Sequence, residues 1–209
     1  MNESVAFEPR TVRRTVGIVA ALNFGYFWVQ VAVALAIGSV ALFADSVDFL
    51  EDTAVNLLIL IALGWSLRRR AIVGQIMAGI ILVPSLAAAW MAFVQARNPE
   101  PPDVTALIVT AGGAMIVNGL CAVILLRIRR HGGSLTAAAF LSARNDVLVN
   151  ATIMLMAGLT AWTSSGWPDI ILGIVILVLN ATAAKEVWEV AREEHLAAKA
   201  LAGEAIDDD

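Results

Sequence analysis

The stretch Asp45-Ser-Val-Asp48-Phe-Leu-Glu51-Asp52 places four carboxylates within eight residues of an otherwise apolar sequence. Mostly apolar residues lead into it from position 31 and follow it to position 65. An ionisable side chain at the centre of a spanning helix costs roughly 2.5–3.5 kcal/mol on insertion scales, so such acids usually face a cavity and mark an ion pathway. On a helix, positions 45, 48 and 52 form one stripe, while Glu51 points to its side. The stretch therefore predicts a cation site within a membrane-spanning helix.

The composition is that of a protein that crosses a lipid bilayer several times. The 209 residues are 59% hydrophobic and 15% charged, whereas soluble domains are about 45–50% apolar and about 25% charged. The single cysteine, Cys121, lies in an apolar segment, which excludes a disulfide or a thiolate metal cluster within one chain. Nothing in the sequence indicates a nucleic-acid partner.

Six apolar runs long enough to span a membrane predict an all-α protein of six transmembrane helices. The expected helices cover residues 15–37, 40–67, 71–95, 104–126, 135–162 and 169–187. We expect a cytoplasmic lead over residues 1–14, a transport domain over 15–188 and a short acidic cytoplasmic tail over 189–209.

The arginines predict the orientation of these helices. Clusters at 10–14, 68–70 and 127–130 fall on the same side as the tail, whereas the opposite turns and loops hold one base, Arg97. Because basic loops stay in the cytoplasm, both termini are predicted to be cytoplasmic.

The expected fifth helix carries a second polar stripe. Ser142, Asp146 and Asn150 recur at i, i+4 and i+8, and Asn145 lies beside them. Together with the first stripe they offer carboxylate, hydroxyl and amide oxygens, which suit a divalent cation such as Mn²⁺ or Mg²⁺. The alternative is a buried hydrogen-bond network that only holds helices together. Three buried acids with few nearby bases repel one another unless a cation or protons neutralise them, which favours the cation site.

Three further residues are assigned accessory roles along the pathway. Asp45 is expected one turn from Asp48, either as a helper on the exit path or as a helix-end cap. Glu51 points to the side of the first stripe, and Asn150 continues the second one turn beyond Asp146. None of the spans contains a nucleophile–base pair, a phosphate-binding loop or the spacing of a zinc hydrolase, so an enzyme is not expected.

Two motifs resemble the cation diffusion facilitator family. The run from Gly38 to Asp52 is similar to the Ala-Asp-Ala/Ser-x-His/Asp-x-x-x-Asp signature of that family's second helix. Ser142-Ala-Arg-Asn-Asp146, followed by Asn150, resembles the matching motif of its fifth helix. The resemblance covers about residues 12–188, and it implies six helices with both termini in the cytoplasm.

The resemblance also implies the ligands. Asp48 and Asp52 occupy the two ligand positions of the second helix, and Asp146 occupies the second position of the fifth. Ser142 stands where the family usually has His or Asp, and Asn145 is a substitute oxygen ligand. No span contains histidine, so an all-oxygen site favours Mn²⁺, Fe²⁺ or Co²⁺ over Zn²⁺, with Zn²⁺ and Cd²⁺ still open as substrates.

The family's activity implies metal efflux from the cytoplasm in exchange for protons by alternating access, with no resident cofactor. The chain resembles a short form without the cytoplasmic metal-binding domain of longer relatives, so a homodimer is expected to form through membrane helices or the short tail. The expected location is the bacterial cytoplasmic (inner) membrane. Two other functions stay open: a non-transporting membrane protein with a structural or ion-sensing acidic cluster, and a transporter of another cationic solute.

Overall fold

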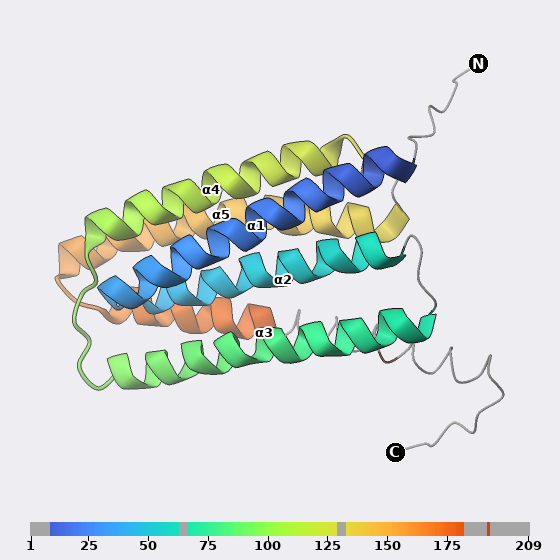
Figure 1. Ribbon diagram of the computed structural model, residues 1–209. Helices are drawn as coiled ribbons and strands as arrows, with labels where there is room; N and C mark the ends of the chain where they lie inside the picture. The colour runs from blue at the N-terminus through green and yellow to red at the C-terminus, as the bar shows by residue number, and fades with distance from the viewer. Residues whose placement is uncertain (1–8, 63–66, 129–132, 182–191, 193–209) are drawn as a thin grey trace.

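The computed structural model describes residues 9–62, 67–128, 133–181 and 192, which form helices, turns and loops with no strand among them. Five labelled helices and one further helix follow one another along the chain (Figure 1). They are α1 (Pro9–Ile37), α2 (Val40–Ala62), α3 (Leu67–Gln95), α4 (Val104–Leu126), α5 (Gly133–Thr163) and the last described helix (Trp167–Ala181). The protein is therefore an all-α membrane protein, as predicted, and its described residues form six helices.

The boundary predicted between the second and third helices was wrong. Leu67 and the arginines at 68–70 belong to the start of α3, whereas α2 ends at Ala62 within the described residues. Arginine is a good helix former, so a basic cluster marks the membrane surface without ending a helix. Residues 182–187, the predicted end of the sixth helix, lie outside the described residues, as do residues 1–8 of the lead and nearly all of the tail.

Four of the described helical segments are long and apolar enough to cross a membrane. They are Arg10–Ile37, Gln75–Gln95, Val104–Leu126 and Ala138–Thr163. The helix α2 has 23 residues, enough to span, but carries the four acids that lower its hydropathy. The described part of the last helix, Trp167–Ala181, is shorter and apolar.

The helices α1, α2, α4 and α5 pack around a polar layer, and α3 lies along one side of this bundle, where it packs on α2 (Figure 1). One apolar cluster fills one half of the bundle, with Leu42, Leu107 and Ile153 among its members. A second fills the other half, with Val16 and Leu125 among its members. The polar side chains of α2 and α5 lie between these clusters, so the site is enclosed by close-packed apolar residues on either side.

The start of α2 is held by a residue from the last helix. Gly38 has φ of 70°, a left-handed conformation that glycine adopts without a Cβ clash, and it turns the chain from α1 into α2. The hydroxyl of Ser39 and the backbone N–H of Val40 both donate to the buried carboxylate of Asp169, each at 2.6 Å. Asp169 is 129 residues away from Val40 in the sequence. Its carboxylate therefore accepts from the start of α2, where backbone N–H groups have no partner within the helix.

Replacing Asp169 with alanine is expected to destabilise the protein by about 2 to 3 kcal/mol, because a buried hydroxyl and a buried N–H lose a charged acceptor. SDS-induced unfolding followed by circular dichroism measures this loss. The matched control is Asp103→Ala, which removes an exposed cap that accepts from the N–H of Ala106 at 2.8 Å and should cost about 1 kcal/mol. Equal losses in the two variants would contradict the role given to Asp169.

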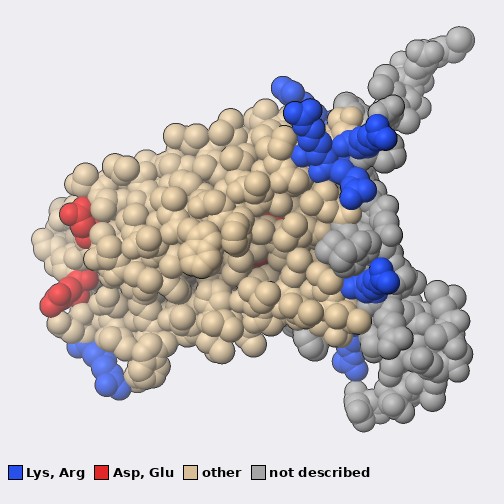
Figure 2. Space-filling model, in the orientation of Figure 1, with Lys and Arg blue, Asp and Glu red and all other residues tan. Residues whose placement is uncertain are grey.

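The two ends of the bundle differ in charge. One end holds the starts of α1, α3 and α5 and the ends of α2 and α4 (Figure 1). Figure 2 shows most of the visible Lys and Arg side chains gathered at this end, whereas the most prominent acidic side chains lie at the opposite end beside a basic one. We refer to the first as the arginine end.

Candidate functional site

Two helices bring the predicted ligands to the same depth. Asp48 and Asp52 lie one turn apart on α2, and Ser142 and Asp146 lie one turn apart on α5. At about 1.5 Å of rise per residue, Asp48 and Asp52 are about 12 to 18 Å along the helix from its first residue, near the middle of a hydrocarbon layer about 30 Å thick. The predicted stripes are therefore at mid-membrane depth and belong to neighbouring helices.

The two stripes border one cavity of about 250 Å³, which we call the acidic cavity. Its polar lining consists of Asp48, Glu51, Asp52, Ser142, Asn145, Asp146 and Asn180. No lysine, arginine or histidine is among the described residues that line it. The cavity therefore offers a cation carboxylate, hydroxyl and amide oxygens without a competing positive charge.

Asp52 accepts hydrogen bonds from side chains of two other helices. The hydroxyl of Ser142 donates to its Oδ1 at 2.9 Å, and the amide of Asn23 donates to its Oδ2 at 3.4 Å. Asn23 in turn accepts a hydrogen bond from the thiol of Cys121 at 3.6 Å. Asp52 is buried, with 4% of its surface exposed, so its position is fixed by contacts from α1 and α5 together.

The other predicted ligands differ in burial. Asp146 is buried, whereas Asp48 and Glu51 are half-buried and Asn145 is exposed. The guanidinium of Arg144 donates to Oδ1 of Asn145 at 3.3 Å. Asp48, Glu51 and Asn145 therefore lie on the more open side of the cavity.

Asp45 and Asn150 belong to a separate network and do not line the acidic cavity. The amides of Gln30 and Asn150 both donate to the carboxylate of Asp45, the latter at 3.4 Å. Asn150 also donates to the backbone carbonyl of Asp146 at 2.9 Å. Asp45 lies in the second turn of α2 and is fully buried, so it is not a helix-end cap. Instead it links α1, α2 and α5 beside the cavity.

Asn180 lines the acidic cavity but was not predicted from the sequence. It lies near the end of the described part of the last helix, and its amide donates to the backbone carbonyl of Ala44 at 3.1 Å. A lone amide in an apolar run was the available signal, since a buried amide needs a partner. Its carbonyl oxygen adds a third helix to the possible ligand donors.

The carboxylates share the cavity without converging on a point. Among residues 9–62, 67–128 and 133–181, no three side chains of His, Cys, Asp or Glu lie close enough to hold one metal ion. In the conformation described, the acids stand on separate walls: Asp48, Glu51 and Asp52 on α2, and Asp146 on α5.

Comparison with known protein families gives the chain its identity. Residues 16–194 match the family described as "Cation efflux transmembrane domain", which is most of the 209-residue chain. No curated protein matched the chain. Apart from residues 9–15 of α1, the matched segment contains all six described helices and both polar stripes, and it agrees with the resemblance noted in the two motifs. The chain therefore belongs to the cation efflux family of metal cation transporters.

Proposed function

We propose that the protein exports a divalent metal ion from the cytoplasm in exchange for protons, and that it binds the ion in the acidic cavity. The proposed ligands are Asp48, Asp52 and Asp146, with Ser142 and Asn145 as neutral oxygen donors. One observation carries the proposal: a mid-membrane cavity is lined by four carboxylates and no described basic residue. Such a cluster is unfavourable unless cations or protons neutralise it.

The proposed transport mechanism is alternating access, and the arrangement of the cavity walls supports it. The carboxylates of α2 and α5 lie on separate rigid helices, so a small approach of one helix to the other would gather the ligands around an ion. Opening toward the far side would then let protons replace the metal on the same oxygens. In this scheme metal and protons compete for one set of carboxylates, and this competition couples their movements in opposite directions.

The direction of transport rests on the charge difference between the ends of the bundle. Basic residues favour the cytoplasmic side of a membrane, so the arginine end is proposed to face the cytoplasm, with both termini on that side (Figure 2). The connection from 97 to 103, which contains Glu100 and Asp103, then faces outward.

The donor set favours hard and borderline divalent ions. The cavity lining supplies oxygen donors alone, and the described spans contain no histidine. The proposed substrate is therefore Mn²⁺, Fe²⁺ or Co²⁺, and Zn²⁺ and Cd²⁺ stay open.

Transport into vesicles tests the proposal. The purified protein is reconstituted in liposomes with an imposed proton gradient, and uptake of Mn²⁺, Fe²⁺, Co²⁺, Zn²⁺ and Cd²⁺ is measured together with the internal pH. We expect uptake of at least one ion, with protons moving the opposite way, and no uptake in protein-free liposomes. Absence of uptake for every ion would favour a structural or ion-sensing acidic cluster. Proton flux that no metal changes, together with uptake of an organic cation, would favour a different cationic solute.

A further inference from the structure

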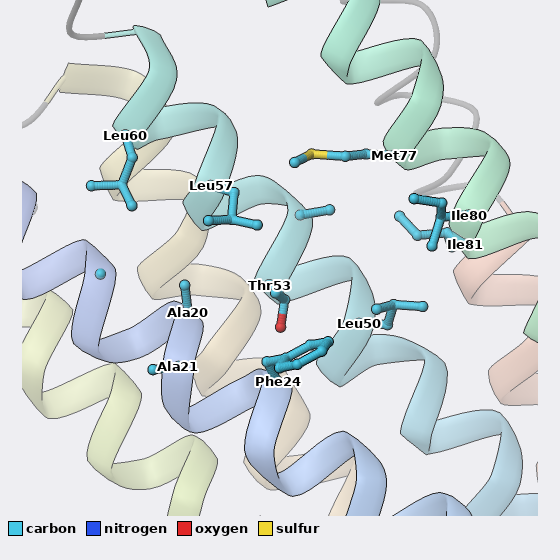
Figure 3. Close-up of a pocket in the computed structure, with 12 residues that line it drawn as sticks. Ala20, Ala21, Phe24, Leu50, Thr53, Leu57, Leu60, Met77, Ile80 and Ile81 are labelled. Carbon is cyan, nitrogen blue, oxygen red and sulfur yellow. The ribbon is translucent and has the colours of Figure 1, made fainter.

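A second cavity is drawn in Figure 3. The α2 residues that line it are on the opposite face of that helix from those that line the acidic cavity. This second cavity has a volume of about 420 Å³, and we call it the apolar groove. Its walls are α1 between Gly17 and Phe24, α2 between Leu50 and Leu60, and α3 between Met77 and Ile81. The groove exists because α3 packs on α2 and stands away from α1, and no described side chain fills the space between them.

The lining of the groove is almost entirely hydrocarbon. Its one hydroxyl, that of Thr53, donates to the backbone carbonyl of Phe49 at 2.7 Å and is therefore already satisfied within α2. Figure 3 shows Leu57, Met77 and Ile80 at the walls of the same space. Water needs two or more polar partners to occupy a cavity, and this one offers none. Its occupant in a membrane is therefore apolar.

Arginines stand above the groove at the arginine end. Arg13 precedes Gly17 by one turn, and positions 13, 17, 20 and 24 share a face of α1. Arg69 lies in the first turn of α3, two turns before Met77. Both side chains are exposed, so their guanidinium groups are available to a phosphate at the membrane surface.

The length of the groove matches one leaflet. From Arg13 to Phe24 the helix rises about 16 Å at 1.5 Å per residue, and half of a hydrocarbon layer about 30 Å thick is about 15 Å. A chain anchored at the level of the arginines would therefore end near Phe24, where the groove ends.

The opposite end of the same three helices, α1, α2 and α3, differs from the arginine end. A second apolar cavity, lined by Leu35, Phe43 and Trp90 among others, lies between α1, α2 and α3 toward the opposite end. The nearby base, Arg97, is engaged with the ring of Phe93, with its guanidinium carbon 4.4 Å from the ring centroid. Among the described residues, an apolar groove with exposed arginines on two of its helices is thus found at the arginine end.

We propose that the apolar groove binds one acyl chain of an anionic phospholipid from the leaflet at the arginine end, with the lipid phosphate held by Arg13 and Arg69. The exposed arginines at the arginine end favour an anionic lipid over a helix from a second copy, because an apolar helix face offers no phosphate for the guanidinium groups to bind. The bound chain would support the back of α2, because Leu50 and Leu57 face the groove while Asp48 and Asp52 face the acidic cavity.

Native mass spectrometry of the full chain tests this site with phosphatidylglycerol and phosphatidylcholine as competing lipids. The wild type is expected to retain one phosphatidylglycerol in preference to phosphatidylcholine. Gly17→Leu is expected to lose that lipid, because a Cβ at position 17 points toward Leu60, with 4.0 Å between Cβ and Cδ1, and a longer side chain extends into the groove. The control, Gly119→Leu, adds the same atoms to α4 where nothing lies within 4 Å, and it should retain the lipid.

The arginines are tested separately from the groove. Arg13→Ala and Arg69→Ala should each lower the preference for phosphatidylglycerol by about five-fold while leaving phosphatidylcholine binding unchanged. Equal retention of both lipids by the wild type, or unchanged retention in Gly17→Leu, would overturn the proposal. If Gly17→Leu instead abolishes a dimer and leaves lipid retention unchanged, the groove is an interface between copies. These readouts do not involve metal transport, so they stand whether or not the proposed export is correct.

Discussion

Asp52→Asn is expected to abolish metal uptake, with a loss of at least about 100-fold, because it removes a full charge and one ligand oxygen from the acidic cavity. The substituted side chain has nearly the same shape as the original. Its oxygen still accepts from the hydroxyl of Ser142, which lies 2.9 Å from Oδ1 of the wild-type carboxylate. Its new N–H₂ group faces the amide of Asn23, so that amide must turn its own oxygen toward position 52.

The change in the free energy of unfolding that this adjustment causes distinguishes a transport role of Asp52 from a purely structural one. When Asn23 turns, its side-chain oxygen no longer accepts the hydrogen bond from the thiol of Cys121. A thiol is a weak donor, so Asp52→Asn should lower the free energy of unfolding by about 1 kcal/mol. Uptake in proteoliposomes and SDS-induced unfolding are measured on the same preparations. Asp103→Asn serves as the control, since it changes an exposed acid at the outer end of α4. Full uptake by Asp52→Asn, or unfolding of that variant under native conditions, would contradict a ligand role.

The six helices were predictable because the bilayer fixes the length of an apolar run that can cross it. The predicted limits of the fourth helix, 104 to 126, are those of α4, where Asp103 caps the start. The limit between α2 and α3 was not predictable in the same way. Between them the sequence stays apolar up to the arginines at 68–70, and helix propensity does not distinguish a helix that ends from one that continues.

Much of the candidate site was also predictable, because helical periodicity decides which residues share a face. The spacing of Asp48 and Asp52, and of Ser142 and Asp146, predicted two facing stripes, and both stripes line the acidic cavity. Asp45 satisfied the same periodicity but is one turn beyond the cavity, held by Gln30 and Asn150. Helical periodicity predicts which residues share a face of a helix. It does not predict where along that face the cavity ends, because that limit depends on how the neighbouring helices pack.

Two contacts depend on the last helix and could not be read from the local sequence. Asn180 reaches the cavity wall and the carbonyl of Ala44, and Asp169 caps α2 from the other end of the same helix. Both contacts join residues more than 120 positions apart. A single polar residue in an apolar helix indicates that it needs a partner, but it does not indicate which helix provides one. The last helix therefore positions α2, and with it the acids that α2 carries.

Ser142→His is expected to change the preferred metal. The hydroxyl of Ser142 borders the acidic cavity and donates to Asp52 at 2.9 Å, so a side chain at this position reaches the same space as the carboxylates. Imidazole nitrogen is a better ligand for zinc than a hydroxyl is, whereas manganese prefers oxygen. The ratio of Zn²⁺ to Mn²⁺ uptake should therefore rise by about ten-fold or more.

Competition between the two ions measures this change directly. Proteoliposomes are supplied with equal Zn²⁺ and Mn²⁺, and the metal taken up is quantified by mass spectrometry. Ser142→Asn is the matched control, because it removes the same hydroxyl but offers an amide oxygen in place of a ring nitrogen, and it should leave the ratio near that of the wild type. If the histidine and asparagine variants give the same ratio, position 142 does not contact the ion. The hydroxyl then acts only by orienting Asp52, and the metal preference must be set by the carboxylates of α2 and α5 alone.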